Sequence, residues 1–224
     1  MCGRFTQTAS PAVIAQQFDV AEPPLFTPRY NIAPSQPVAA IRIEPATTTR
    51  QLVLLRWGLI PSWAKDPKIG HQCINAKAET VAEKPSFRAA FKTRRCLVIA
   101  TGFYEWQVQG RSKQPMWIGL KSKQPFAFAG LWEQWQPPEG EVIESCTILT
   151  TEPNELLRPI HNRMPVILSP TSYDQWLDPT VQDTVPLKAL LRPYPGDELL
   201  AYPVSTLVNN PRHDAPDCLE PLPV

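Results

Sequence analysis

The sequence predicts an α+β fold: a mainly antiparallel, barrel-like β-sheet core with short peripheral helices and proline-rich loops. Strand-like apolar runs follow one another without regular alternation with helices, which favours an antiparallel sheet. The chain holds 27 prolines against 9 glycines, spread between the apolar runs, which indicates stiff loop corners. Its 224 residues suffice for one core and are few for two. With no repeat or linker, we expect a single domain over residues 1–224.

In the first half of the chain, two stretches are typical of helices. Ser10 followed by PAVIAQQF predicts a short helix over residues 11–18, with Ser10 as its N-cap and Pro11 at the first helical position. SFRAAFK predicts a helix near Ser86, because a capping residue precedes helical apolar spacing. Between these helices we expect a polar loop at 29–37 (RYNIAPSQP), strands at 38–43 and 51–57, and a loop at 58–70.

The second half predicts a succession of strands. Four apolar or aromatic runs follow closely, at 96–102, 103–108, 115–120 and 126–132. QGRSKQ, at 109–114, predicts a turn between the second and third of them. After an acidic loop we expect a strand at 145–151, a short helix leading into a loop and strand within 153–168, helices at 169–177 and 186–191, and a final strand at 199–205.

Composition excludes several classes of protein. We find neither a signal-peptide pattern nor an apolar run approaching the roughly 18 residues that cross a bilayer, so no membrane association is expected. The five cysteines are odd in number and form no C-x-x-C pair, which favours free thiols in the cytoplasm and argues against a metal site. Net charge is +1, yet residues 56–95 carry nine basic and three acidic residues. That stretch predicts a basic face for a polyanion, with solvated surface charge as the alternative.

Cys2 stands where unusual chemistry is available. Initiator methionine is commonly removed before a small residue, and removal here would leave an α-amine (pKa about 7.7–8.0) beside a thiol (pKa about 8.5). The amine can attack an aldehyde to form a Schiff base, and the thiol can then close a five-membered thiazolidine. The thiolate could instead attack an acyl group with the terminal amine as base. A small apolar residue near a terminus is the structural alternative.

Three further polar residues have settings that suggest a site. Glu105 lies in the strand-like run GFYEWQV, where alternation places it on the face opposite Tyr104 and Trp106. If that face meets a pocket, desolvation would raise its pKa and suit it to proton transfer. His161 lies in a predicted loop, RPIHNRMPV, and Asn75 in the polar stretch INAKAET. Each has an ordinary alternative: a solvated strand face, a surface histidine or a turn asparagine.

These stretches also form an ordered set. MCGRF at Met1, RYNIAP at Arg29, WGLIPSW at Trp57, INAKAET at Ile74, GFYEW at Gly102 and IHNRMPV at Ile160 follow one another along the chain. In this order they closely resemble the SOS-response-associated peptidase (SRAP) family, whose members sense abasic sites and crosslink themselves to DNA. The resemblance extends from Met1 to about Val208.

The resemblance implies a role for each residue. Cys2 would form a thiazolidine with the ring-opened sugar of an abasic site in single-stranded DNA. Asn75 would orient the sugar or the N-terminus, Glu105 would assist proton transfer, and His161 would be the acid that opens the sugar ring. If Glu105 and His161 converge, the carboxylate should favour the protonated imidazole. The residues implied in DNA binding are Arg4, Asn31, Pro34, Trp63, Lys77 and Arg163.

The resemblance also implies abasic-site lyase activity and autocatalytic, peptidase-type removal of the initiator residue. We expect no cofactor, a monomer, and association with the nucleoid when bound to DNA. Two residues depart from the family pattern. Lys77 stands where an arginine is frequent, so charge is kept without a bidentate fork. Trp63 stands alone where some relatives carry two adjacent aromatic residues.

Two other classes of protein remain compatible with the residues. An N-terminal-nucleophile (Cys) amidohydrolase would also begin with M-C-G, but it leaves the RYNIAP, NAKAET and HNRMP stretches without a task. A noncatalytic single-strand DNA-binding module would use the basic 56–95 stretch and the tryptophans. It would bind reversibly, with strong salt dependence and no preference for the lesion. No role is predicted for His213 in the C-terminal tail, and Cys73 is expected to be a buried structural thiol.

Overall fold

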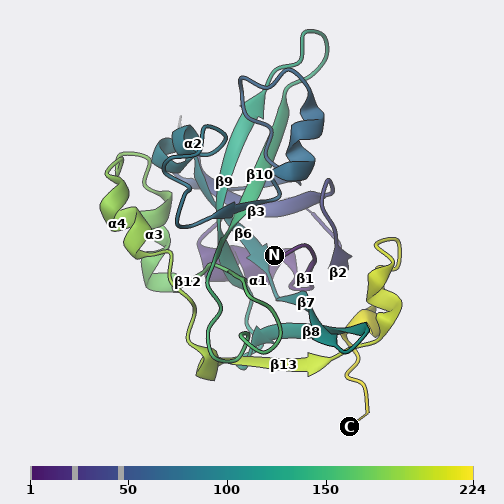
Figure 1. Ribbon diagram of the computed structural model, residues 1–224. Coiled ribbons are helices and arrows are strands. Elements are labelled where there is room, and N and C mark those ends of the chain that lie inside the picture. Colours follow the sequence, from purple (N-terminus) through teal and green to yellow (C-terminus); the bar gives the residue numbers. More distant parts are fainter. Residues whose placement is uncertain (1, 22–24, 45–47, 224) are drawn as a thin grey trace.

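The computed structural model describes residues 2–21, 25–44 and 48–223, and over these ranges the chain has a closed five-stranded barrel at its centre (Figure 1). The barrel order is β10-β4-β3-β6-β9, and β9 pairs with β10 again to close the ring. Only the β4–β10 pair among these barrel strands is parallel. The bounds are β3 Pro37–Ile43, β4 Arg50–Trp57, β6 Arg95–Ala100, β9 Phe126–Trp135 and β10 Ile143–Thr151.

A second, fully antiparallel sheet packs against the barrel in the order β13-β8-β7-β1-β2. Its strands are β1 Phe5–Gln7, β2 Arg29–Ile32, β7 Gly102–Gln109, β8 Ser112–Leu120 and β13 Leu199–Pro203. The chain passes from barrel strand β6 to β7 through Thr101 alone, so the two sheets are joined directly. Three short strands extend the barrel sheet: β5 Asn75–Lys77, β11 Met164–Pro165 and β12 Ile167–Leu168.

The layer between the two sheets holds the N-terminal segment. Phe5 is fully buried, and its ring meets Trp57 at 5.2 Å and Phe128 at 5.8 Å between centroids, both edge-on. Cys2 belongs to the same buried cluster. Edge-to-face aromatic contacts of this kind add to the free energy of burial. The fold therefore anchors Cys2 and Phe5 deep in the molecule.

The helices are short and lie at the periphery, as expected. Ser10 Oγ accepts a hydrogen bond from the Val13 amide at 3.4 Å, which makes Ser10 the predicted N-cap. No helix among the described residues has the length and apolar character needed to cross a membrane. The α-helices are α1 Pro11–Phe18, α2 Arg88–Thr93, α3 Tyr173–Leu177 and α4 Thr184–Ala189; the 3₁₀ helices are η1 Pro67–Gln72, η2 Pro170–Ser172, η3 Gly196–Glu198, η4 Thr206–Asn209 and η5 Pro216–Leu219.

The predicted α+β class with its barrel-like core is confirmed, and so are the strands and the hairpin turn. That turn consists of Gly110 and Arg111 between β7 and β8. Gly110 has φ +60°, which a residue without Cβ adopts at little cost.

Two predicted elements were wrong. Residues 29–37 are not all loop, because Arg29–Ile32 forms β2 by pairing with β1. The helix expected at the start of 153–168 is a series of turns over 155–160. Two α-type bonds occur there, from the Arg158 amide to the Asn154 carbonyl at 2.9 Å and from the His161 amide to the Leu157 carbonyl at 2.8 Å, and they do not extend into a helix. Pro159 lacks the amide proton that a continuing helix would need.

Candidate functional site

Cys2 lies in the layer between the sheets with a fully buried side chain. Asn75 Nδ2 donates a hydrogen bond of 2.8 Å to the Cys2 carbonyl oxygen. Asn75 is the first residue of β5, which pairs in parallel with β10 and so is fixed to the barrel. The sheet thus positions an amide that holds the backbone of the predicted nucleophile.

The same asparagine offers a second polar atom. Asn75 Oδ1 is buried, and none of the residues that the structure describes forms a hydrogen bond with it. A buried polar atom without a partner costs free energy, so such atoms are concentrated where ligands bind. Asn75 therefore donates to Cys2 through its amide nitrogen and keeps an acceptor that no described residue uses.

Glu105 approaches Cys2 from β7. As alternation predicted, Tyr104 and Trp106 pack in a separate cluster on the other face of the strand, and Glu105 is only 2% exposed. Burial raises the pKa of its carboxyl to about 7. A carboxyl group with that pKa can both donate and accept a proton at neutral pH.

The thiol of Cys2 is in its neutral form. Burial raises its pKa far above the ordinary value, and the neighbouring Glu105 charge raises it further. Because the electrostatic effect of one charge on another falls with distance, the effect of Glu105 on the Cys2 pKa indicates that the two side chains are close. Because a thiolate is the stronger nucleophile, the thiol needs a proton acceptor nearby when it reacts.

His161 is the next polar side chain of the site and lies beside Glu105. Its Nε2 lies 3.8 Å from Glu105 Oε2, and its Nδ1 lies 3.1 Å from both the amide nitrogen and the carbonyl oxygen of Arg163. The two side chains do converge, but the carboxylate does not favour the protonated imidazole as predicted, because burial lowers the pKa of His161. Desolvation is the largest cause of this shift, and the hydrogen bond with the Arg163 backbone opposes it only in part. His161 is thus neutral at pH 7 and can still exchange protons through Nε2.

Arg163 is held beside this group by a fork of hydrogen bonds. Nη1 and Nη2 donate to the two carboxylate oxygens of Glu79 at 2.6 and 3.0 Å, and Nη2 also donates to the Thr150 carbonyl at 2.6 Å. The hydrogen bonds from Arg163 hold the pKa of Glu79 below its usual value. The sequence reasoning missed Glu79, although it belongs to the same NAKAET stretch as Asn75.

The other residues predicted to bind DNA differ in how far they are exposed. Trp63 is 57% exposed in the loop after β4, and Lys77 is exposed at the end of β5. Pro34 is partly buried in the turn after β2. Arg4 and Asn31 instead bond to each other at 2.7 Å, and Asn31 is completely buried. The structure does not bring Asn31 to the surface, and the roles of all these residues toward DNA stay predictions.

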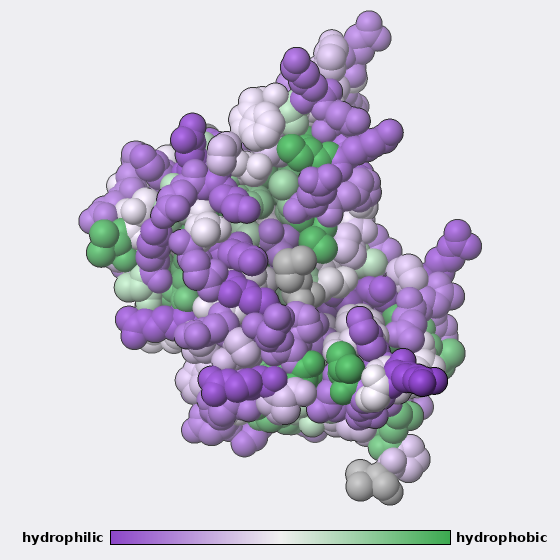
Figure 2. All heavy atoms as spheres, viewed as in Figure 1, coloured by the Kyte–Doolittle hydropathy of each residue, from purple (hydrophilic) through white to green (hydrophobic). Residues whose placement is uncertain are grey.

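Figure 2 gives the surface character of the face viewed in Figure 1. Most of that face is hydrophilic, and its apolar residues form small, separate areas. A surface of this kind suits a polar, charged ligand better than an apolar one.

The fold and site together define a class of protein: a β-barrel domain whose second residue is a buried cysteine held by an amide, with a buried carboxyl group near it that in turn faces an imidazole. The chain matches the family model described as SOS response associated peptidase (SRAP) over residues 1–211. The chain belongs to this family.

Individual proteins also match the chain over most of its length. The chain is 48% identical over 224 residues to the abasic site processing protein YoqW of Bacillus subtilis (strain 168), covering 98% of this chain and 99% of the relative. It is 35% identical to the abasic site processing protein HMCES of Xenopus tropicalis, covering 87% of this chain and 66% of that protein.

Solved structures share the fold. A crystal structure of a Bacteroides thetaiotaomicron protein superposes with a TM-score of 0.89 at 26% identity, covering 99% of this chain and 100% of that one. A second, from Bordetella bronchiseptica, gives a TM-score of 0.76 at 28% identity, with coverage of 91% and 100%.

Proposed function

We propose that this chain processes abasic sites in single-stranded DNA by trapping their aldehyde covalently on Cys2 once Met1 has been removed. The observation that carries the proposal is the convergence on Cys2 of Asn75 and of Glu105, a buried carboxyl group with a pKa of about 7. Relatives at 35–48% identity that are named abasic site processing proteins support the same substrate.

The proposed reaction begins at the amine. The α-amine of Cys2 adds to C1′ of the ring-opened sugar, and the resulting carbinolamine loses water to give an imine. The sulfur then adds to the imine carbon, while the thiol proton is passed to the nitrogen. One aldehyde and one aminothiol thus give one thiazolidine and one water. Glu105 and His161, 3.8 Å apart, are placed to move these protons.

The imine offers a second route, the lyase activity. An imine at C1′ makes the C2′ proton acidic, and its removal expels the 3′ phosphate with breakage of the C3′–O bond. The carboxylate form of Glu105 is the base in this proposal. Ring closure by the thiol removes the imine, so the thiol of Cys2 competes with strand cleavage.

Exposure of the amine requires hydrolysis of the bond between Met1 and Cys2, with one water consumed. We assign this step to the chain itself, in line with the peptidase name of its family. Asn75 would hold the Cys2 backbone during the step through the bond that it donates to the Cys2 carbonyl.

The test uses abasic single-stranded DNA and protein whose intact N-terminus has been identified by mass spectrometry. Protein lacking Met1 should give an adduct that survives denaturant without borohydride, and Cys2→Ala should abolish that adduct. Cys73→Ala, which removes another buried thiol, should leave adduct formation unchanged. A stable adduct formed by Cys2→Ala at the wild-type rate would falsify the proposal.

A further inference from the structure

The C-terminal segment after β13 is fastened to the edge of the second sheet by several polar contacts. Asn31 Nδ2 donates to the carbonyl oxygens of Val208, Asn210 and His213, at 3.2, 3.1 and 2.6 Å. Asp214 Oδ1 accepts from the amides of Tyr30 and Asn31 at 2.5 and 2.9 Å. Most of the segment lies beyond the family match, which ends at residue 211, and the proposed reaction does not use it.

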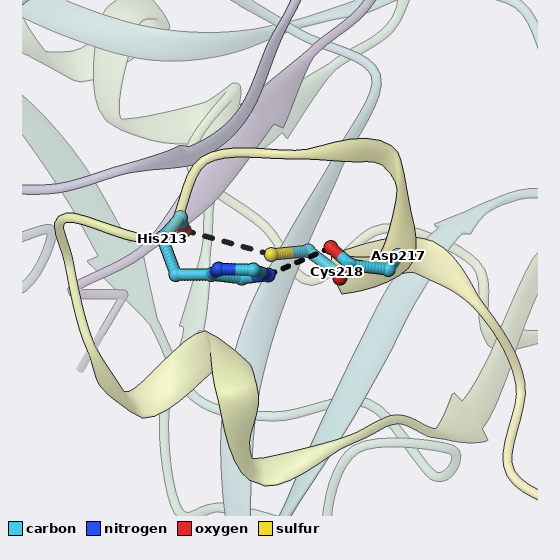
Figure 3. Close-up of side chains that lie close together, drawn as sticks. All are labelled: His213, Asp217 and Cys218. Carbon is cyan, nitrogen blue, oxygen red and sulfur yellow. Dashed lines mark hydrogen bonds and ion pairs between the residues drawn. The ribbon is translucent and has the colours of Figure 1, made fainter.

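Three side chains of different chemistry converge in this segment (Figure 3). His213 Nε2 lies 2.7 Å from Asp217 Oδ1, and the Cys218 sulfur lies 3.6 Å from the His213 carbonyl oxygen. The imidazole nitrogen, the carboxylate oxygen and the sulfur all lie within 4.8 Å of one another. Asp217 and Cys218 belong to η5, whereas His213 precedes that helix.

The cluster is closed on one side and open on the other. Cys218 is completely buried, whereas the side chains of His213 and Asp217 are 30% and 40% exposed. A contact between His213 and Asp217 would suffice to hold the tail. It does not account for a thiol directed at the same point, whose hydrogen bond to the His213 carbonyl is long and weak.

We propose that His213, Asp217 and Cys218 bind one divalent transition-metal ion of the zinc type, with water in the fourth position. Nitrogen, oxygen and thiolate sulfur are the donors that Zn²⁺ takes, in tetrahedral geometry with bonds of about 2.0–2.3 Å. Such bonds place the donors about 3.3–3.8 Å apart. The 2.7 Å contact must therefore open by about half an ångström, and a separation at the 4.8 Å limit must close by about 1 Å.

Binding has a defined proton balance and a structural consequence. The thiol of Cys218 releases its proton to solvent as the metal–sulfur bond forms, and His213 binds as neutral imidazole. The ion would lock residue 213 to residues 217–218. Asn31 already holds the carbonyl oxygens of Val208 and His213 from the sheet, and the ion would hold the same segment from its other side. The 2.6 Å bond from Arg4 Nη1 to the Val208 carbonyl would be stabilised in the same way.

The experiment titrates untagged, reduced, chelator-treated protein with Co²⁺ and then with Zn²⁺. Every variant carries Cys2→Ala, because a free N-terminal aminothiol is itself a chelator. One equivalent of Co²⁺ should give a thiolate-to-cobalt charge-transfer band in the near ultraviolet, and Zn²⁺ should remove that band by displacement. Cys218→Ser should abolish the band, and His213→Gln should weaken Co²⁺ binding at least about 10-fold.

The variant Asp217→Asn distinguishes a loss of metal binding from a loss of folding. The amide keeps the shape of the side chain and its contact with His213, so melting without metal should stay near that of the parent protein. The stabilisation by Zn²⁺ should nevertheless be reduced or lost. Cys73→Ser and His71→Gln, which change a thiol and a histidine elsewhere, should bind Co²⁺ normally. The proposal is overturned if the parent shows no band, or if Cys218→Ser and Asp217→Asn bind metal as the parent does.

Discussion

Replacing Glu105 by glutamine should stabilise the protein at pH 8 while it slows the crosslinking reaction. Burial raises the pKa of Glu105 from 4.5 to about 7, which corresponds to about 3 kcal/mol of preference for its neutral form. Because the folded pKa lies above the unfolded one, the stabilisation by protonation is fully present below about pH 4.5. It is lost as the pH rises through about 7.

Glutamine has the same shape and is neutral at every pH. The gain in free energy of unfolding for Glu105→Gln should therefore be near zero at pH 4.5 and reach up to about 3 kcal/mol at pH 8. For a chain of this size that gain corresponds to roughly 6–12 °C in melting temperature. Urea or thermal unfolding at several pH values measures it.

Glu133→Gln is a matched control with the opposite expected sign. Glu133 is also buried, but its carboxylate accepts a bond of 2.7 Å from Arg94 Nη2. Loss of that charge should destabilise the protein at pH 8 by about 1 kcal/mol or more, because a charged hydrogen bond is weakened. A Glu105→Gln effect that does not change with pH, or a loss of stability at pH 8, would refute the assignment of a desolvated carboxyl group.

The same variant reports on chemistry. Loss of a general acid–base group commonly costs about 100-fold or more in rate. Crosslinking by Glu105→Gln should slow to that extent, whereas its affinity for uncleaved DNA should change little. The wild-type pH–rate profile should show an inflection near pH 7 that the variant lacks.

Substitutions at three other residues separate the remaining roles. Asn75→Ala should slow adduct formation in a gel time course and cost about 1 kcal/mol of stability through the lost bond to the Cys2 carbonyl; Asn75→Asp should be no better, because it replaces the donor. Trp63→Ala should weaken binding of single-stranded DNA about 5- to 100-fold by anisotropy without lowering the melting temperature, since the ring is 57% exposed. A binding constant within twofold of wild type would exclude stacking. Arg163→Lys should reduce DNA affinity and keep its salt dependence, because lysine retains the charge but cannot form the bidentate hydrogen bond that Arg163 makes to Glu79. A reduced slope of DNA affinity against salt concentration would contradict this.

Local signals in the sequence predicted much of the fold. Ser10 before a proline and an amphipathic run defined α1 with its ends, and alternation predicted that Glu105 lies on the face of β7 opposite Tyr104 and Trp106. The closure of the barrel had no such signal. It depends on β10 pairing with β9, its neighbour in sequence, and also with β4, some ninety residues earlier.

The strand β2 was missed for the same reason, because contacts with residues distant in the sequence make it a strand. RYNI is polar and stands before a proline-rich turn, so by local pattern it predicts a loop. It is a strand because β1 pairs with it and because Asp214, far along the chain, accepts the Tyr30 and Asn31 amides. Arg163 was found by its motif, but its partner Glu79 comes into contact only through the fold.

The burial of Cys2 bears on the order of steps in the proposed reaction. Its position in the chain pointed to an aminothiol, in which either group could react first. In the folded protein, burial holds the thiol in its neutral form and makes it a weak first nucleophile. In unfolded peptides an α-amine has a pKa of about 7.7–8.0, below that of a thiol, and the neutral amine is the group that forms an imine. Amine attack before ring closure therefore follows from the environment. Loss of water then leaves a cationic imine beside Glu105, and that positive charge favours the carboxylate form, which can take the thiol proton.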